Sequence, residues 1–246
     1  MDRLIYTAMT GAKHIMEQQA NTAHNLANVS TTGFRAQLDS FRAVPVLNEG
    51  LATRTYVVDS SVGNDFSQGP NQETGRALDV AIQGKGWIAV QMADGSEAYT
   101  RQGSLKTTEN GLLQTASGMS VLGDGGPISI PPDVNVSIAS DGTISSTERA
   151  GKPGQANTIG RVKLVNPPEA SLVRGDDGLF HLPAGTDADA DPAVRLAGGA
   201  LEGSNVNAVD AMVNMISLGR QFEMHMSLLK NAESNAAKAS QLMSLS

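Results

Sequence analysis

Hydrophobic positions follow a helical spacing at both ends of the chain and a strand-like spacing between them. Near the start, apolar or small residues recur at alternating steps of three and four, the spacing of a coiled-coil seam. This pattern predicts a helix over residues 3–29. The seam is thin, because Gln19 and Thr22 interrupt it and two of its members are alanines. Its positions are Ile5, Ala8, Ala12, Ile15, Gln19, Thr22, Leu26 and Val29.

A longer helix is predicted at the other end of the chain. Ser204 follows Gly203 and is a favourable N-cap, so we expect the helix to begin there. An apolar stripe follows, changes phase near Gly219, and resumes at seven-residue intervals. A helix of about 40 residues would reach roughly 60 Å and needs a partner along its length. The stripe consists of Val206, Val209, Val213, Ile216, Phe222, Leu229, Ala236 and Met243, with Ala232 and Ala239 between the last members.

The segment between the helices reads as β-structure. All ten prolines lie from Pro45 to Pro192, where short apolar runs alternate with glycine-containing turns. The run "ALDVAIQGKGWIAVQ" predicts a hairpin across Gly84-Lys85-Gly86. Further turns are expected at residues 93–96, 109–111, 140–143 and 175–178.

These patterns divide the chain into four segments. They are an N-terminal helix (1–32), an extended linker with a few strands (33–75), a β-rich domain (76–203) and a C-terminal helix (204–246). The expected fold class is therefore α+β: a mainly β core domain with long N- and C-terminal α-helices.

Composition narrows the range of partners. The chain has 18 Lys and Arg against 25 Asp and Glu, a net charge of −7, and no basic run, which disfavours nucleic acid and anionic membranes. It has no cysteine, so thiolate chemistry and disulfides are excluded. No apolar stretch approaches ~18 residues and no secretory signal pattern is seen. We expect no membrane insertion, and export from the cytoplasm without a cleaved signal peptide would need a dedicated exporter.

Candidate chemistry is sparse. His14 and His24 are ten positions apart, so they do not share the helix face of a metal pair. The acidic run Asp187–Asp191 resembles the start of a calcium loop but lacks the required Gly and distal Glu. No nucleophile motif or carboxylate couple stands out. We therefore expect no catalytic, cofactor-binding or metal-binding residue, and no enzyme.

Four stretches together carry a resemblance to flagellar rod and hook proteins. They are "NLANVSTTGFRAQ" (25–37), "LDVAIQGKGWIAV" (78–90), "YTRQGSLKTTENGLLQTASGMSVLG" (99–123) and "LEGSNVNAVDAMVNMI" (201–216). The resemblance covers nearly the whole chain in the family's order, and is greatest to proximal-rod members. Leu105 and Trp87 depart from the aromatic and Phe that are common there. The residues that carry the family signature are Asn25, Leu26, Ala27, Asn28, Gly33, Phe34, Arg101, Gly103, Ser204, Asn205, Val206 and Asn207.

The resemblance implies a structural subunit of the flagellar basal-body proximal rod, located in the periplasmic space. The terminal helices would form the inner layer of a helically stacked tube that is both drive shaft and export channel. The implied partners are copies of this chain, other proximal- and distal-rod proteins, and the flagellar type III export apparatus. No cofactor is implied. A distal-rod subunit is the alternative, and a homo-oligomeric binding module or a β-rich secreted enzyme are rivals from other classes.

Periodicity alone leaves two uses for the terminal stripes open, since they could pair within one chain as an antiparallel hairpin or pack between subunits. The resemblance favours packing between subunits. A thin stripe rich in alanine buries little apolar area, so we expect the ends to order on assembly. The residues predicted to pack between subunits are Ile5, Ala8, Ala12, Ile15, Leu26, Val29, Val206, Val209, Val213, Ile216, Phe222, Leu229, Ala236 and Met243.

Overall fold

The computed structural model describes residues 2–45, 55–148, 157–183 and 185–244. They form two compact units. The first, the helical unit, consists of Met1–Val29, Ala36–Asp65 and Val206–Ser246. The second, the β unit, consists of Ser30–Arg35 and Phe66–Asn205.

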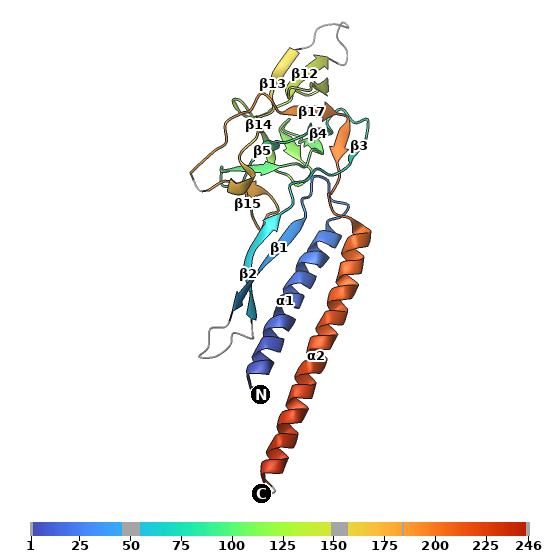
Figure 1. The fold of residues 1–246 in the computed structure, drawn as a ribbon. Coiled ribbons are helices and arrows are strands. Elements are labelled where there is room, and N and C mark those ends of the chain that lie inside the picture. Colours follow the sequence, from blue (N-terminus) through green and yellow to red (C-terminus); the bar gives the residue numbers. More distant parts are fainter. Residues whose placement is uncertain (1, 46–54, 149–156, 184, 245–246) are drawn as a thin grey trace. The chain divides into compact units, whose positions relative to one another are not determined.

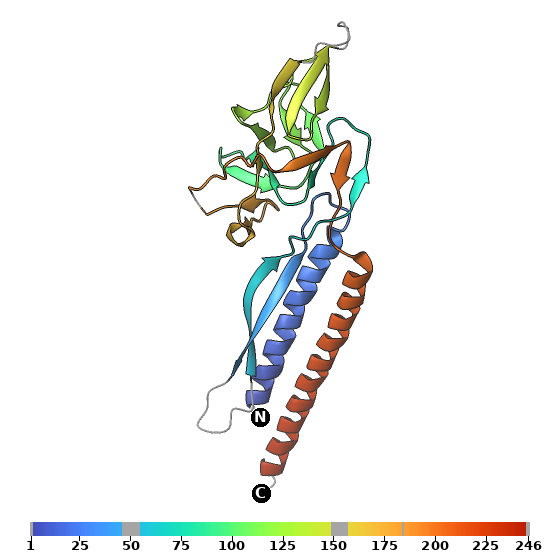
Figure 2. The same ribbon diagram turned by 45° about the horizontal axis from the view of Figure 1, so that its top comes forward.

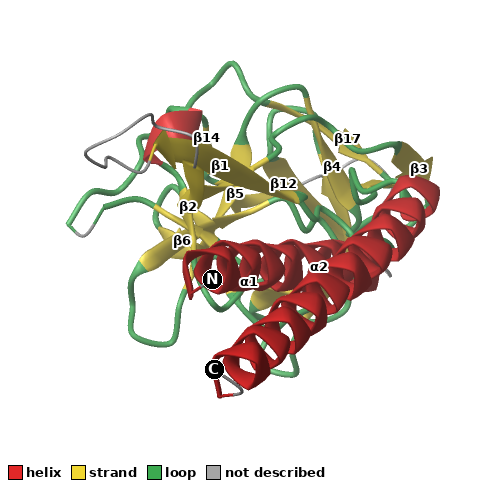
Figure 3. Ribbon diagram, turned by 60° about the horizontal axis from the view of Figure 1, so that its bottom comes forward, coloured by secondary structure: helices red, strands yellow, loops and turns green. Residues whose placement is uncertain are grey.

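The helical unit is built on two antiparallel helices. Helix α1 spans Asp2–Ala27 and helix α2 spans Ala208–Ser244, and their N- and C-terminal ends lie at the same end of the pair (Figures 1 and 2). With 37 residues, α2 is roughly 55 Å long and continues without a break through Gly219. Strands β1 (Gln37–Pro45) and β2 (Thr55–Asn64) pair antiparallel and contact α1. Figure 3 shows the two helices side by side from another direction.

The predicted helix ends are corrected by the structure. Helix α1 stops at Ala27, where Asn28 donates backbone and side-chain hydrogen bonds to the His24 carbonyl oxygen, so Val29 lies in a turn beyond the helix. Helix α2 begins at Ala208 and not after Ser204. Its cap is Asn207, whose Oδ1 accepts the backbone N–H of Val209 at 3.0 Å, and Val206 therefore precedes the helix.

The β unit contains one large sheet, in the order β15-β16-β6-β5-β9-β8-β7, with β10 and β14 beside β9 and β5. Its strands are β5 (Trp87–Gln91), β6 (Glu97–Thr100), β7 (Leu105–Thr107), β8 (Leu113–Thr115), β9 (Ser120–Gly123), β10 (Gly126–Pro127), β14 (Leu164–Val165), β15 (Val173–Arg174) and β16 (Phe180–His181). A short 3-10 helix, η1 (Glu169–Ser171), precedes β15.

Three smaller sheets complete the β unit. Strand β12 (Thr143–Glu148) lies between β11 (Val134–Ile138) and β13 (Asn157–Arg161). Strands β4 (Val80–Gln83) and β17 (Arg195–Gly198) form one pair, and β3 (Asn71–Glu73) and β18 (Ala200–Glu202) form another.

The prediction of a hairpin across Gly84-Lys85-Gly86 is wrong, because the two flanking strands do not pair with each other. Strand β4 pairs with β17, whereas β5 pairs with β6, β9 and β14. Gly84 (φ 78°) and Gly86 (φ 135°) both adopt backbone conformations that favour glycine, and the chain between them leaves one sheet and enters another. The four other predicted turns are confirmed, since they join β5 to β6, β7 to β8, β11 to β12 and β15 to β16.

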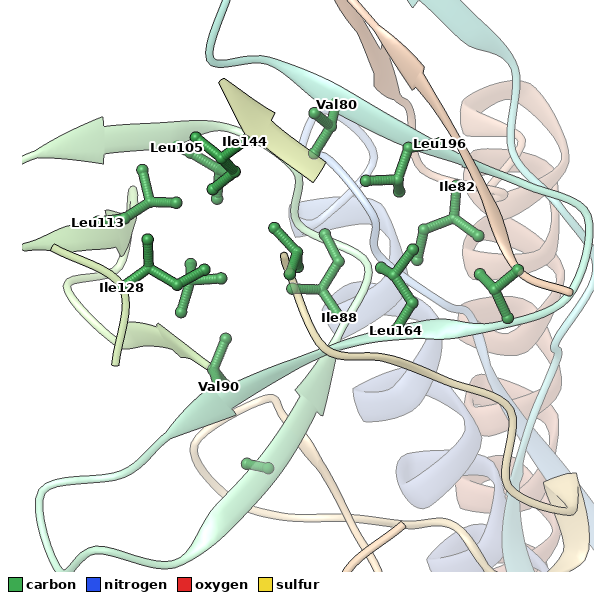
Figure 4. Packing of buried hydrophobic residues seen from close by; sticks show 14 of the residues in the cluster. Val80, Ile82, Ile88, Val90, Leu105, Leu113, Ile128, Ile144, Leu164 and Leu196 are labelled. Atoms are coloured by element: carbon green, nitrogen blue, oxygen red, sulfur yellow. The ribbon is translucent and has the colours of Figure 1, made fainter. Parts of the chain in front are cut away.

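An aliphatic core fills the β unit. Figure 4 shows side chains of β4, β5 and β17, including Val80, Ile88 and Leu196, pointing toward one another with residues from the other strands. A second cluster contains the single tryptophan, Trp87, whose ring centroid lies 4.6 Å from that of Phe180. The predicted class, mainly β with two long terminal helices, is confirmed.

Candidate assembly interface

The α1–α2 contact within one chain is a regular seam. The less exposed positions of α2 recur at alternating steps of four and three, which brings them to one side of the helix. On α1, Gly11 lies against the His225 ring of α2, and Ala8, Ala12 and Ile15 are buried in the single chain. The α2 seam consists of Ala211, Met215, Leu218, Phe222, His225, Leu229 and Ala232.

One polar side chain lies within this seam. A Cβ added to Gly11 would approach the His225 ring Cε1 to 2.6 Å, so the ring packs directly onto the α1 backbone. The His225 Nδ1 atom is buried, and no described residue hydrogen-bonds to it. Gly11 therefore provides the space that His225 occupies.

A different face of α2 is apolar and exposed. Val209, Val213 and Ile216 are 68%, 60% and 59% exposed, and their spacing places them on the side of the helix away from the seam. Met212 lies beside them and is also exposed. We call these four residues the outer stripe. Because water meets most of its surface in the single chain, the outer stripe is a candidate surface for binding another molecule; Met224 and Leu228 are further exposed apolar residues of α2.

Helix α1 also has an open apolar side. Tyr6, Met9 and Met16 are each more than half exposed, whereas the side of α1 that carries Asn21 and Asn25 bonds to β1. One face of α1 thus contacts α2, a second contacts the β1–β2 strand pair, and a third is uncovered within the helical unit.

The single C-terminal stripe predicted from the sequence is therefore two surfaces. Phe222 and Leu229 belong to the α1-facing seam, whereas Val209, Val213 and Ile216 form the outer stripe. Of the predicted α1 positions, Ala8, Ala12 and Ile15 are buried in the single chain, and Ile5 and Leu26 are half-buried. Packing of these residues between subunits stays a prediction. The side chains of Ala236 and Met243 lie outside the described ones.

Sequence reasoning missed most of the α2 seam. The predicted stripe was assigned to the outer valines, which also follow a helical spacing. It therefore did not include Ala211, Met215, Leu218 and His225. An unbroken four-three repeat from Ala211 to Ala232 was the signal that would have found them.

Several signature residues of the helical unit fix the ends of its elements. The Asn25 side chain accepts the backbone N–H of Gln37 and donates to its carbonyl oxygen, both at 2.9 Å, which ties the start of β1 to α1. Asn28 and Asn207 cap the ends of α1 and α2. Leu26 and Ala27 occupy the last turn of α1, and Val206 precedes α2.

The signature residues of the β unit lie where segments that are far apart in the sequence pack closely together. Gly33 has φ +70°, donates its N–H to the Glu202 carbonyl oxygen, and would collide with the Arg101 backbone if it carried a Cβ. Gly103 is packed as closely against the Val80 carbonyl group. The carbonyl oxygen of buried Phe34 accepts a hydrogen bond from the Asn205 backbone N–H. The preceding residue, Ser204, is also buried.

A buried ionic cluster holds these segments together. Glu202 Oε1 forms an ion pair with Arg35 Nη2 at 2.6 Å, and Glu202 Oε2 accepts a hydrogen bond from Arg101 Nη1 at 2.9 Å. All three side chains are almost inaccessible to water. Burial lowers the pKa of Arg101, and the Glu202 carboxylate opposes that effect. From its motifs, Arg101 was expected only as a signature residue, and Arg35 and Glu202 were not singled out, although opposite charges inside apolar motifs are visible in the sequence.

The described residues offer little for chemistry. In residues 2–45, 55–148, 157–183 and 185–244, no group of three His, Asp or Glu side chains is placed to hold a metal ion. Neither α1 nor α2 combines the length and apolar character needed to cross a bilayer.

Comparison with known proteins identifies the family to which this chain is related. A family model described as flagellar hook protein FlgE/F/G D1 domain matches residues 81–146, and one described as flagellar basal body rod FlgEFG protein C-terminal matches residues 197–242. The flagellar basal-body rod protein FlgF of Escherichia coli is 49% identical over the full length of both chains. The chain belongs to the flagellar basal-body rod protein family.

Other relatives agree. The FlgF protein of Salmonella typhimurium is 47% identical over the full length of both chains. A FlgG rod protein of Buchnera aphidicola is 32% identical over 89% of this chain and 92% of its own. The greater similarity lies with FlgF. As a member of the rod protein family, the chain is a structural subunit of the flagellar basal body and not an enzyme.

Proposed function

We propose that this chain is a proximal-rod subunit whose outer stripe packs against neighbouring subunits. The observation that carries the proposal is the exposure of Val209, Val213 and Ile216 on a helix whose other side is already occupied by α1. Four apolar side chains on one exposed helix face are an unfavourable surface for a monomer, and their burial between subunits would stabilise a stacked tube.

In this proposal the partners are copies of this chain and other rod proteins, in the helically stacked arrangement of the rod and hook family. The terminal helices line the inner layer of the drive shaft and of the export channel, in the periplasmic space, after passage through the flagellar type III apparatus. The predicted four-segment division and the intersubunit positions outside the outer stripe belong to the same proposal.

The test places charge on the outer stripe. The double substitution Val213→Asp and Ile216→Asp should abolish motility, because two carboxylates would have to be buried unpaired between subunits. The matched control is Asn214→Asp with Ser217→Asp, which adds the same charge to the same turns of α2 at exposed polar positions. Swimming in soft agar and recovery of the subunit in purified basal bodies are the measurements.

The expected result is loss of both readouts in the first variant and retention in the control, with an unchanged NMR spectrum of the β unit in both. A motile Val213→Asp/Ile216→Asp strain would overturn the proposal. Quantitative mass spectrometry of wild-type basal bodies separates proximal from distal rod: a low, fixed ratio to the other rod subunits supports the proximal position, and a several-fold higher ratio supports a distal one.

A further inference from the structure

The β unit contains a groove that the rod assignment does not use. Its volume is about 820 Å³, and it lies between the turn after β7 and the start of β11. Half-buried Leu78, Val134 and Val136 and buried Ile130 give it an apolar floor that continues into the core of the β unit. Every lining residue belongs to the β unit.

One wall of the groove is the edge strand β11. It pairs with β12 on one side, in an unshifted antiparallel register. The Ala139 N–H donates to the Thr143 carbonyl oxygen, so Asn135 and Ser137 direct their backbone groups to β12. Val134 and Val136 consequently direct theirs away from the sheet, and no residue in the described part of the chain hydrogen-bonds to them.

Strand β11 itself lacks the usual protection against another strand, although Pro131, Pro132 and Asp133 directly precede it. Protein edges are commonly blocked by charged residues, proline or a bulge, and β11 (Val-Asn-Val-Ser-Ile) contains none of these. The unpaired N–H and C=O groups of Val134 and Val136 are therefore available to an added strand, with an apolar floor for alternate side chains of the incoming segment.

The rim of the groove is acidic. Glu109 and Asp133 line it, no Lys or Arg does, and neither carboxylate forms an ion pair with a described residue. Asp133 has φ +59°, and it is the one non-glycine residue with positive φ among those the structure describes. Such a conformation recurs at binding sites. The charge of the rim favours a basic occupant.

We propose that this groove binds an extended segment of a partner protein, with alternating aliphatic and basic residues, which adds to β11 as a further strand. Backbone hydrogen bonds to Val134 and Val136 hold the segment, aliphatic side chains contact the groove floor, and basic side chains reach Glu109 and Asp133. The proposal goes beyond the rod function and does not depend on it.

The test uses the full-length chain and a defined probe, the acetylated lysine–valine–lysine–valine–lysine amide. Binding is followed through the backbone amide signals of Val134 and Val136 in NMR spectra at constant ionic strength. The expected result is saturable binding that shifts both signals. The same peptide with glutamate for lysine, and the lysine peptide N-methylated at alternate amides, should each bind at least about tenfold more weakly.

Two variants test the two recognition elements separately. Glu109→Gln with Asp133→Asn removes the rim charge and should weaken the lysine peptide about tenfold, with Asn chosen because it tolerates positive φ. The matched control is Asp124→Asn, at an exposed site outside the groove. Val136→Pro removes an outward N–H without removing a bond to β12, and should weaken binding about fivefold to tenfold.

Three outcomes would overturn the proposal. They are no saturable binding, equal binding of the lysine and glutamate peptides, or equal binding to wild type and the rim variant. If Val136→Pro does not fold, the N-methylated peptide tests the backbone contribution. Sedimentation of the free chain adds a fourth: a dimer that dissociates on rim neutralisation would assign the groove to a second copy and not to a basic segment.

Discussion

Glu202 is one carboxylate between two guanidinium groups in the interior of the β unit. Because the groups of Arg35 and Arg101 are also buried, each depends on Glu202 for compensation of its charge. Glu202→Gln should destabilise the β unit by about 3–5 kcal/mol, because two buried cations would be left without a counter-charge. Guanidinium chloride unfolding followed by Trp87 fluorescence measures this. Glu73→Gln, an exposed change in neighbouring β3, should alter stability little, and an equal effect of both would contradict the assignment.

Asp141 sits in the tight turn between β11 and β12. Its carboxylate accepts the Thr143 backbone N–H at 3.0 Å and the Thr143 hydroxyl at 2.9 Å, and these bonds hold the pKa of Asp141 below its ordinary value. A lowered folded-state pKa stabilises the fold above the unfolded-state pKa of about 3.9, and this contribution is lost as pH falls through the folded-state value.

Asp141→Asn should therefore flatten the dependence of stability on pH below about pH 4. The free energy of unfolding, measured by urea titration at a series of acidic pH values, checks it. Thr143→Val, which removes one of the two donors, should produce a smaller change in the same direction. An unchanged acid slope in Asp141→Asn would show that the turn does not contribute.

At the scale of the element, the two helical glycines offer a direct test of the α1–α2 seam. A Cβ at Gly11 would meet the His225 ring, whereas one at Gly219 would meet nothing within 4 Å. Gly219→Ala should stabilise the chain by about 0.5–1 kcal/mol through helix propensity alone. Gly11→Ala should be destabilising, by about 1–3 kcal/mol, because the added methyl group overpacks the seam.

Thermal unfolding followed by circular dichroism at the helical band measures both variants. The combination Gly11→Ala with His225→Ala should recover most of the loss, because the colliding ring is then absent. If Gly11→Ala were as stabilising as Gly219→Ala, His225 would not occupy the space beside Gly11.

The elements also differ in how their boundaries are set. Helix α2 begins where Asn207 can accept two backbone N–H groups, and β1 begins where Asn25 bonds Gln37. Both anchors are side-chain bonds within a single chain, so neither boundary depends on a second subunit.

At the scale of the whole molecule, the two units differ in how much core they contain. The β unit has a contiguous aliphatic core, whereas the larger side chains of the α2 seam are only half-buried and the outer stripe is exposed. The helical unit should therefore unfold at lower denaturant concentration in the isolated chain. The helical circular dichroism signal reports on the helices, and fluorescence of the single tryptophan, Trp87, reports on the β unit. We expect two separate unfolding transitions. Coincident transitions would contradict the prediction that the helical unit is the less stable of the two.

Periodicity in the sequence determined the two long helices, the β-rich segment between them and most of the turns. These features depend on local rules: apolar spacing, glycine at positive φ and the absence of proline from the ends. The motifs also determined the family, because four stretches occur in its order along the whole chain. The same local rules failed at Gly84-Lys85-Gly86, since a glycine turn does not specify whether the flanking strands pair with each other.

Only the tertiary structure decided which apolar residues are buried and which are exposed. The sequence placed Val213 and Phe222 in one stripe, yet α1 covers Phe222 and leaves Val213 in water, because burial depends on where the partner helix lies. The Arg35–Glu202–Arg101 cluster and the edge of β11 are equally non-local. The cluster joins segments that are far apart along the chain, and the edge of β11 is a strand with a partner on one side only. No periodic pattern in the sequence marks either feature, because both depend on how the strands pair in the folded sheets.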